Sequence, residues 1–251
     1  MTTDFFSSAK AIEAEVIAWR RRIHERPEIA FEEHETAAFV EEKLREFGYA
    51  PKRVGATCVV AVLEGQKGPG RTIGLRADMD ALPGVEETDL PFASKTPGVM
   101  HSCGHDVNTA IRLGVAKILA RWTDEMPGRT KFFCPPAEEV LGGAKPFVDA
   151  GELDDVDGLA ALHVMTDIET GHIAARKGVA LAASDVLAIT VSGKAAHGAQ
   201  PHRGRDAVVV AAQVVAAPHT VGSSHAAPLG SVGPTLGKIH RGFCPHRTPA
   251  A

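Results

Sequence analysis

Residues 101–106 (His-Ser-Cys-Gly-His-Asp) place a thiol and an imidazole two positions apart. Thiolate sulfur and imidazole nitrogen are the ligand types that zinc and similar ions prefer. Gly104 lies between Cys103 and His105 and has no Cβ, so the backbone can bend until both side chains face one ion. A buried cysteine beside a hydrogen-bonded histidine gives the same spacing. The pair therefore raises the hypothesis of a metal site that other residues must support.

Further chemistry-bearing side chains occur where other apolar runs of the chain end. The carboxyl ends of parallel strands meet at one edge of a sheet, and ligand sites of α/β proteins form there. If the runs are such strands, these side chains converge with the Cys-x-His pair. Thiolate, imidazole and carboxylate together suit Zn²⁺, Mn²⁺, Co²⁺ or Ni²⁺ better than Ca²⁺ or Mg²⁺. The side chains at the ends of the runs are Asp78, Asp80, Glu138, Glu139 and His163.

Each of these candidates also has an ordinary structural interpretation. Adjacent glutamates such as Glu138 and Glu139 occur on solvated loops. A histidine in an apolar strand, as at His163, is commonly a hydrogen-bonded core residue. A metal site is favoured over these structural interpretations if the strand ends converge.

The elements that must position these residues are predicted from periodicity. Apolar residues at helical spacing alternate with short β-branched runs, which favours an α/β fold with a mainly parallel sheet covered by helices. The predicted helices are residues 12–23, 33–47 and 109–121, and the predicted strands are residues 57–63, 71–77, 130–134 and 158–164. A new pattern then begins, with a predicted strand over residues 185–192, a Gly/His/Pro loop and a helix over residues 206–215. We therefore expect one domain over residues 1–182 and a smaller second one over residues 183–251.

Composition limits the partners. The 251 residues carry a net charge of −4, which does not favour nucleic acid or an acidic membrane surface. We find no apolar run long enough to span a bilayer and no signal-peptide pattern at the N-terminus. The four cysteines form no Cys-x-x-Cys pair, which favours a reducing, cytoplasmic setting.

Taken together, the motifs resemble the metal-dependent amidohydrolases that include aminoacylases, hippurate hydrolases and auxin-conjugate hydrolases, within the aminoacylase/carboxypeptidase superfamily. The resemblance runs from about residue 20 to residue 215. It rests on residues 21–33 (RRIHERPEIAFEE), 75–83 (LRADMDALP), 101–106 (HSCGHD), 136–139 (PAEE), 162–164 (LHV) and 192–202 (SGKAAHGAQPH).

The resemblance implies a zinc-exopeptidase-like fold with an inserted α+β satellite domain, and two divalent ions that activate a water for cleavage of N-acyl amino acids or related amide conjugates. It implies that Glu138 is the general base and that Asp80 orients a ligand. His197 would polarise the scissile carbonyl, with an exposed loop histidine as the alternative, and a homodimer through the satellite domain would be compatible. The implied metal ligands are Cys103, His105, Glu139 and His163.

Three departures bear on activity. Asn108 stands where many relatives have a second histidine, and Pro135 stands where a glutamine is common. Relatives also continue past the length of this chain, with the rest of the satellite domain and a last metal-binding histidine. We therefore expect an incomplete satellite domain. A truncated, weakly active or inactive homologue that only binds metal or a partner is the alternative to a working hydrolase.

Overall fold

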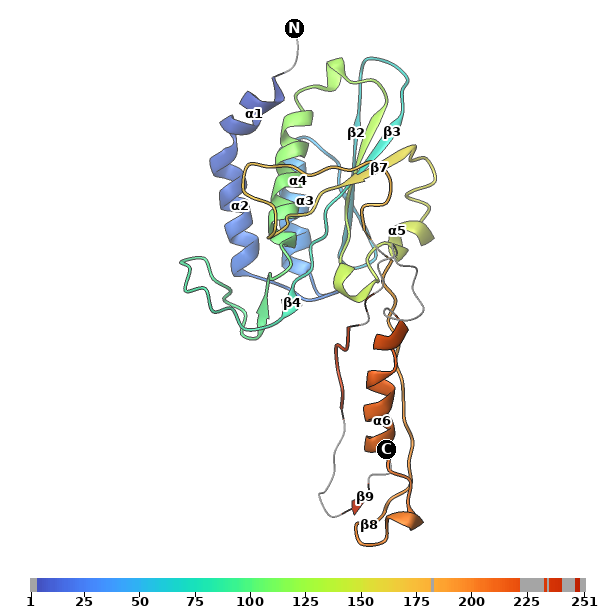
Figure 1. Ribbon diagram of the computed structural model, residues 1–251. Coiled ribbons are helices and arrows are strands. Elements are labelled where there is room, and N and C mark those ends of the chain that lie inside the picture. The colour runs from blue at the N-terminus through green and yellow to red at the C-terminus, as the bar shows by residue number, and fades with distance from the viewer. Residues whose placement is uncertain (1–3, 182, 222–232, 234, 241–246, 249–251) are drawn as a thin grey trace. The chain divides into compact units, whose positions relative to one another are not determined.

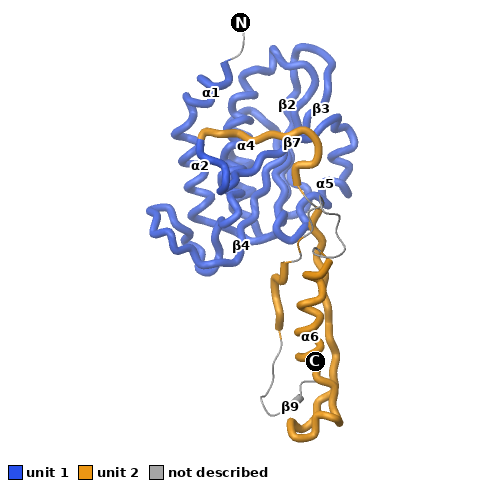
Figure 2. Tube along the Cα trace, viewed as in Figure 1, with its two compact units in different colours: residues 1–170 blue, residues 171–251 orange. Residues whose placement is uncertain are grey.

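The computed structural model describes residues 4–181, 183–221, 233, 235–240 and 247–248 (Figure 1). The chain divides into two compact units, residues 1–170 and residues 171–251 (Figure 2). The division into a catalytic domain and a satellite domain at residues 182 and 183 stays a prediction. Among the described residues, no helix is both long and apolar enough to cross a bilayer.

Unit 1 is an α/β fold around a five-stranded sheet with the order β1-β2-β6-β3-β7. The pairs β3–β6 and β3–β7 are parallel, whereas β1–β2 and β2–β6 are antiparallel. Four strands therefore run in one direction and β2 runs in the other, so the sheet is mixed. The sheet strands are β1 (Lys52–Val54), β2 (Cys58–Glu64), β3 (Thr72–Arg76), β6 (Arg129–Cys134) and β7 (Gly158–Ala161).

Only three residues separate β1 from β2, and a connection that short permits only antiparallel pairing. Four of the five strands share one direction, as expected of a mainly parallel sheet, and β2 is the exception. Apolar periodicity alone does not give the direction of a strand.

Alternate residues of the central strands pack on opposite faces of the sheet, as the pleat requires. Val59 and Phe132 join the larger core with residues of α2, α3 and α4, whereas Val60 and Phe133 join a smaller core with Phe147 of α5. The long helices thus cover one face and a short helix lies on the other (Figure 1). The helices of unit 1 are α1 (Phe5–Ala11), α2 (Glu13–Glu25), α3 (His34–Glu46), α4 (His105–Leu119) and α5 (Lys145–Asp149), with the 3-10 turns η1 (Thr123–Glu125) and η2 (Glu138–Val140) and the short pair β4 (Leu82–Pro83) and β5 (Val99–Met100).

The parallel strands β6, β3 and β7 end at the same edge of the sheet, as the sequence predicted. The chain after β3 carries Asp78 and Asp80, η2 follows β6, and His163 lies just past β7. This edge is where the candidate site forms.

Unit 2 contains the predicted helix as α6 (Ala207–Ala216), with β8 (Ala196–His197), η3 (Pro201–Arg203) and β9 (Arg247–Thr248). The strand predicted over residues 185–192 was wrong, because this segment is not in a ladder. A β-branched sequence favours an extended chain, but a strand forms only with a hydrogen-bonded partner. The satellite domain expected here is therefore not formed as a closed sheet among the described residues.

Candidate metal centre

The cysteine and histidine of the first motif lie at the junction of a loop and a helix. His105 is the first residue of α4, and Gly104 before it has φ +105°, a backbone conformation that favours glycine. A Cβ on Gly104 would lie 2.4 Å from Cγ2 of Val164, so this glycine also permits close approach of the chain after β7. The glycine therefore brings the two segments together.

His105 is held in one tautomer by Asp80, and both residues are fully buried. Nδ1 of His105 lies 2.9 Å from the backbone oxygen of Asp80 and 3.1 Å from its Oδ1, so Nδ1 carries the proton and donates. Burial lowers the pKa of His105, but the hydrogen bond and charge of Asp80 outweigh burial and raise it to about 9. Nε2 of His105 is left buried without a hydrogen-bond partner.

Asp80 also fixes the turn that carries the two glutamates. Its Oδ2 accepts a hydrogen bond from the backbone N–H of Glu139 at 2.9 Å. Glu138 precedes Glu139 in this turn, and its Oε2 lies 3.8 Å from Nε2 of His105. Burial and the nearby charge of Asp78 raise the pKa of Glu138 above its ordinary value. A single buried carboxylate thus orients a histidine from one motif and a glutamate from another.

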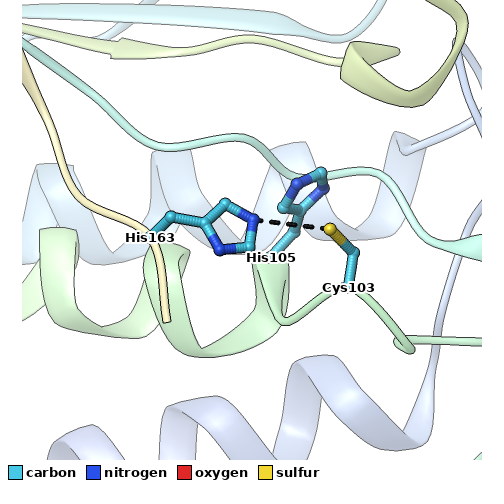
Figure 3. A group of neighbouring side chains, drawn as sticks. All are labelled: Cys103, His105 and His163. Carbon is cyan, nitrogen blue, oxygen red and sulfur yellow. Dashed lines mark hydrogen bonds between the residues drawn. The ribbon is translucent and has the colours of Figure 1, made fainter. Parts of the chain in front are cut away.

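Cys103 and His163 approach each other from different segments (Figure 3). Sγ of Cys103 lies 3.4 Å from Nε2 of His163, whose Nδ1 lies 2.6 Å from the backbone oxygen of Val164. Nδ1 therefore donates to that oxygen, and Nε2 keeps its lone pair for the thiol or an ion. Burial and the charge of Glu139 raise the pKa of the Cys103 thiol to about 12.

The donor atoms form two overlapping groups that share His105. Within each group, the donor atoms lie within 4.8 Å of one another. Nε2 of His105 and Oε1 of Glu139 are buried without a hydrogen-bond partner, as expected of atoms that await a ligand. A sulfur, nitrogen and carboxylate set fits a zinc-class ion, so the residues present suit a divalent metal. The groups are Cys103, His105 and His163, and His105, Glu138 and Glu139.

The other predicted residues have different surroundings. His197 lies in β8 of unit 2, and its Nδ1 accepts a hydrogen bond from the N–H of Ala199 at 3.1 Å. Asp106, which follows His105 in the motif, instead bonds Nδ1 of His24 and Nε of Arg20, both at 2.7 Å. Asp106 therefore anchors α4 to α2.

Sequence reasoning missed two residues that support the centre. The side-chain oxygen of Asn108 accepts from the backbone N–H of Val164 at 3.2 Å and so ties the segment after β7 to α4. Glu33, fully buried, accepts from the backbone N–H of Ala137 directly before Glu138. Residue spacing gives no signal for either contact, because each joins segments far apart in the chain.

Residues 74–237 match the model of the peptidase family M20/M25/M40, and this match covers every candidate ligand. The chain belongs to this family. An N-acyl-L-amino acid amidohydrolase of Geobacillus stearothermophilus is 45% identical over 220 residues, which are 87% of this chain and 59% of that protein.

Two solved structures are similar to this chain in fold. A Staphylococcus aureus protein assigned as an aminohydrolase has a TM-score of 0.81 at 34% identity, over 99% of this chain and 66% of its own. A dinuclear metal binding M20 peptidase of Bacillus subtilis has a TM-score of 0.65 at 39% identity, over 67% of this chain and 48% of its own. This M20 chain therefore spans less than two thirds of these relatives.

Proposed function

We propose that this M20 chain supplies the metal centre of a hydrolase that cleaves the amide bond of N-acyl amino acids or similar conjugates. The observation that carries the proposal is the convergence of sulfur, imidazole and carboxylate donors at one sheet edge, with a further glutamate beside the shared histidine. The name of the Geobacillus relative supports the substrate class. In this proposal, the ion is held by Cys103, His105, Glu139 and His163.

Hydrolysis of an amide at neutral pH needs a nucleophile and a place for its proton. A divalent ion at these ligands would lower the pKa of water and polarise the amide carbonyl. Glu138 takes the proton, the role that the family resemblance implies, and its Oε2 lies 3.8 Å from Nε2 of His105, the histidine shared by the two donor groups. Its raised pKa brings Glu138 closer to the operating pH, which helps it first accept a proton and then give it to the leaving amine.

Asp80 contributes by orientation. Its two oxygens hold His105 and the N–H of Glu139, so the donor atoms of both ligands are fixed before an ion arrives. The family resemblance further assigns His197 to the carbonyl oxygen of the substrate, across a homodimer formed through the satellite domain. Mixing H197A chains with E138Q chains tests this, because a shared site would regain hydrolysis in the mixed dimer only.

The function is tested by a hydrolysis screen of N-acetyl and N-benzoyl amino acids. The protein is stripped with a chelator and reloaded with Zn²⁺, Mn²⁺, Co²⁺ or Ni²⁺, and release of the free amino acid is followed with metal content measured on each sample. We expect release only after reloading. Release by fully stripped protein would contradict the proposal, and bound metal without any release would support the inactive-homologue alternative.

A further inference from the structure

The turn that presents Glu138 and Glu139 has an unusual backbone at both ends. Ala137 before it has φ 57° and Leu141 after it has φ 58°, both in the left-handed region that non-glycine residues rarely adopt. The N–H of Gly142 closes the turn on the oxygen of Ala137 at 3.0 Å. Such a conformation persists only when surrounding contacts hold it.

The side chain of Glu33 supplies one of these contacts. Its Oε1 accepts the backbone N–H of Ala137 at 3.0 Å and that of Phe31 at 3.0 Å. Phe31 is itself left-handed, with φ 66°. One fully buried carboxylate oxygen therefore joins two left-handed residues from segments far apart in the chain.

The ring of Phe31 makes a second contact with the same turn. A Cβ on Gly142 would lie 2.6 Å from Cζ of the Phe31 ring, so the ring packs directly on this glycine. The hydrogen bond at one end of the turn and the ring at the other fix it against the chain before α3.

Glu33 is not used to cap the helix that it precedes. It is the N-cap residue of α3, yet its side chain makes no cap hydrogen bond. Glu28 caps α3 instead, because its carboxylate accepts hydrogen bonds from the backbone N–H groups of Glu35 at 2.9 Å and Thr36 at 2.8 Å. The carboxylate of Glu33 is therefore committed to the glutamate turn, at the cost of burial.

We propose that Glu33 is a positioning residue of the metal centre, which fixes the Glu138–Glu139 turn through the N–H of Ala137. Asp80 holds the N–H of Glu139, so the turn is held by carboxylates on both sides of Glu138. The inference rests on the proposed function, which gives the turn its chemical role. The hydrogen bond itself makes predictions that need neither metal nor turnover.

Two single substitutions separate the hydrogen bond from the charge. E33Q keeps an acceptor oxygen at the same reach and removes the charge. E33D keeps the charge but is one methylene shorter, so its oxygen does not reach the N–H groups of both Phe31 and Ala137. The matched control is E28D, which shortens a carboxylate that also accepts two backbone N–H groups, both of them in α3.

The first readout is amide hydrogen exchange of peptides covering residues 137–142 in metal-free protein, with thermal melts to confirm folding. The second is Co²⁺ affinity together with the cobalt absorption bands, which report the geometry of the bound ligands. We expect E33D to exchange faster over residues 137–142, to bind Co²⁺ about tenfold more weakly or worse, and to show altered bands. E33Q should resemble the parent, and E28D should speed exchange only near the start of α3.

Two results would overturn the proposal. One is parent-like exchange and parent-like Co²⁺ binding in folded E33D. The other is a larger loss of exchange protection and Co²⁺ affinity in E33Q than in E33D, which would assign the role to charge. If E33D does not fold, E33Q decides alone, since a loss in folded E33Q contradicts the hydrogen bond. A parent that binds Co²⁺ but hydrolyses nothing would count against the proposed function and leave this test intact. A parent that binds no Co²⁺ would overturn both.

Discussion

Replacement of Asp80 by asparagine should weaken metal binding without removing any ligand. Asp80 is fully buried, and its two oxygens serve two different donors, Nδ1 of His105 and the N–H of Glu139. Asparagine has one acceptor oxygen, so its NH₂ group would face one of these donors. Nδ1 of His105 keeps its bond to the backbone oxygen of residue 80, so the loss falls on one charge-assisted hydrogen bond.

A hydrogen bond to a charged group contributes about 1.5–3 kcal/mol, and each 1.4 kcal/mol is about tenfold in affinity. We therefore expect D80N to bind Zn²⁺ roughly 10- to 100-fold more weakly, the range typical of residues that orient metal ligands. The assay is competition with a chromogenic chelator at fixed pH, with circular dichroism to confirm the fold.

The matched control is D78N, which makes the same change two residues earlier. Asp78 bonds Nε of Arg76 at 2.9 Å, so the change leaves the hydrogen bonds of His105 and Glu139 in place, although it removes a charge that acts on His105 and Glu138. D78N should therefore lose less affinity than D80N. Equal affinity in D80N and the parent, or an equal loss in D78N, would refute the reasoning.

Three further predictions concern the same centre. Metal binding at neutral pH should release close to two protons, because the pKa values of about 9 for His105 and about 12 for Cys103 keep both side chains protonated in the free protein. Metal affinity should therefore rise with pH. Calorimetry in buffers of different ionisation enthalpy measures the number of protons released, and no release would contradict the prediction. G104A should lower the free energy of unfolding, measured in urea, by at least about 1–2 kcal/mol. Alanine is strained at φ +105°, and its Cβ would clash with Val164. An unchanged free energy of unfolding would show that the loop adapts. N108A should lose about 1 kcal/mol of stability and bind Zn²⁺ severalfold more weakly, because the N–H of Val164 loses its acceptor. Parent-like stability and Zn²⁺ affinity would contradict a role for this hydrogen bond.

Much of the site could be predicted from the sequence because its residues mark the ends of strands. The runs that became β3, β6 and β7 are parallel, and the candidate side chains after them meet at one edge. The helix predicted over residues 109–121 forms as part of α4, which begins within the motif at His105. The sequence pattern is sufficient to place a residue where its position depends only on the end of its own strand or helix.

The remaining features depend on partners that local pattern does not encode. The direction of β2 and the lack of a ladder at residues 185–192 depend on what lies alongside each segment. The left-handed Ala137 depends on Glu33, about a hundred residues earlier in the chain. The sequence places the two glutamates after a strand but does not reveal the 3-10 turn that carries them.

The central claim is that Glu139 binds the ion while Glu138 moves the proton. The most direct test measures metal content and turnover together in E138Q and E139Q. The account predicts that E138Q keeps its metal and loses about 10²- to 10⁴-fold in turnover, the usual contribution of a general base, because an amide does not accept the proton. E139Q should lose metal first and turnover with it. Equal metal loss in both variants, or E138Q with metal and undiminished turnover, would contradict the account.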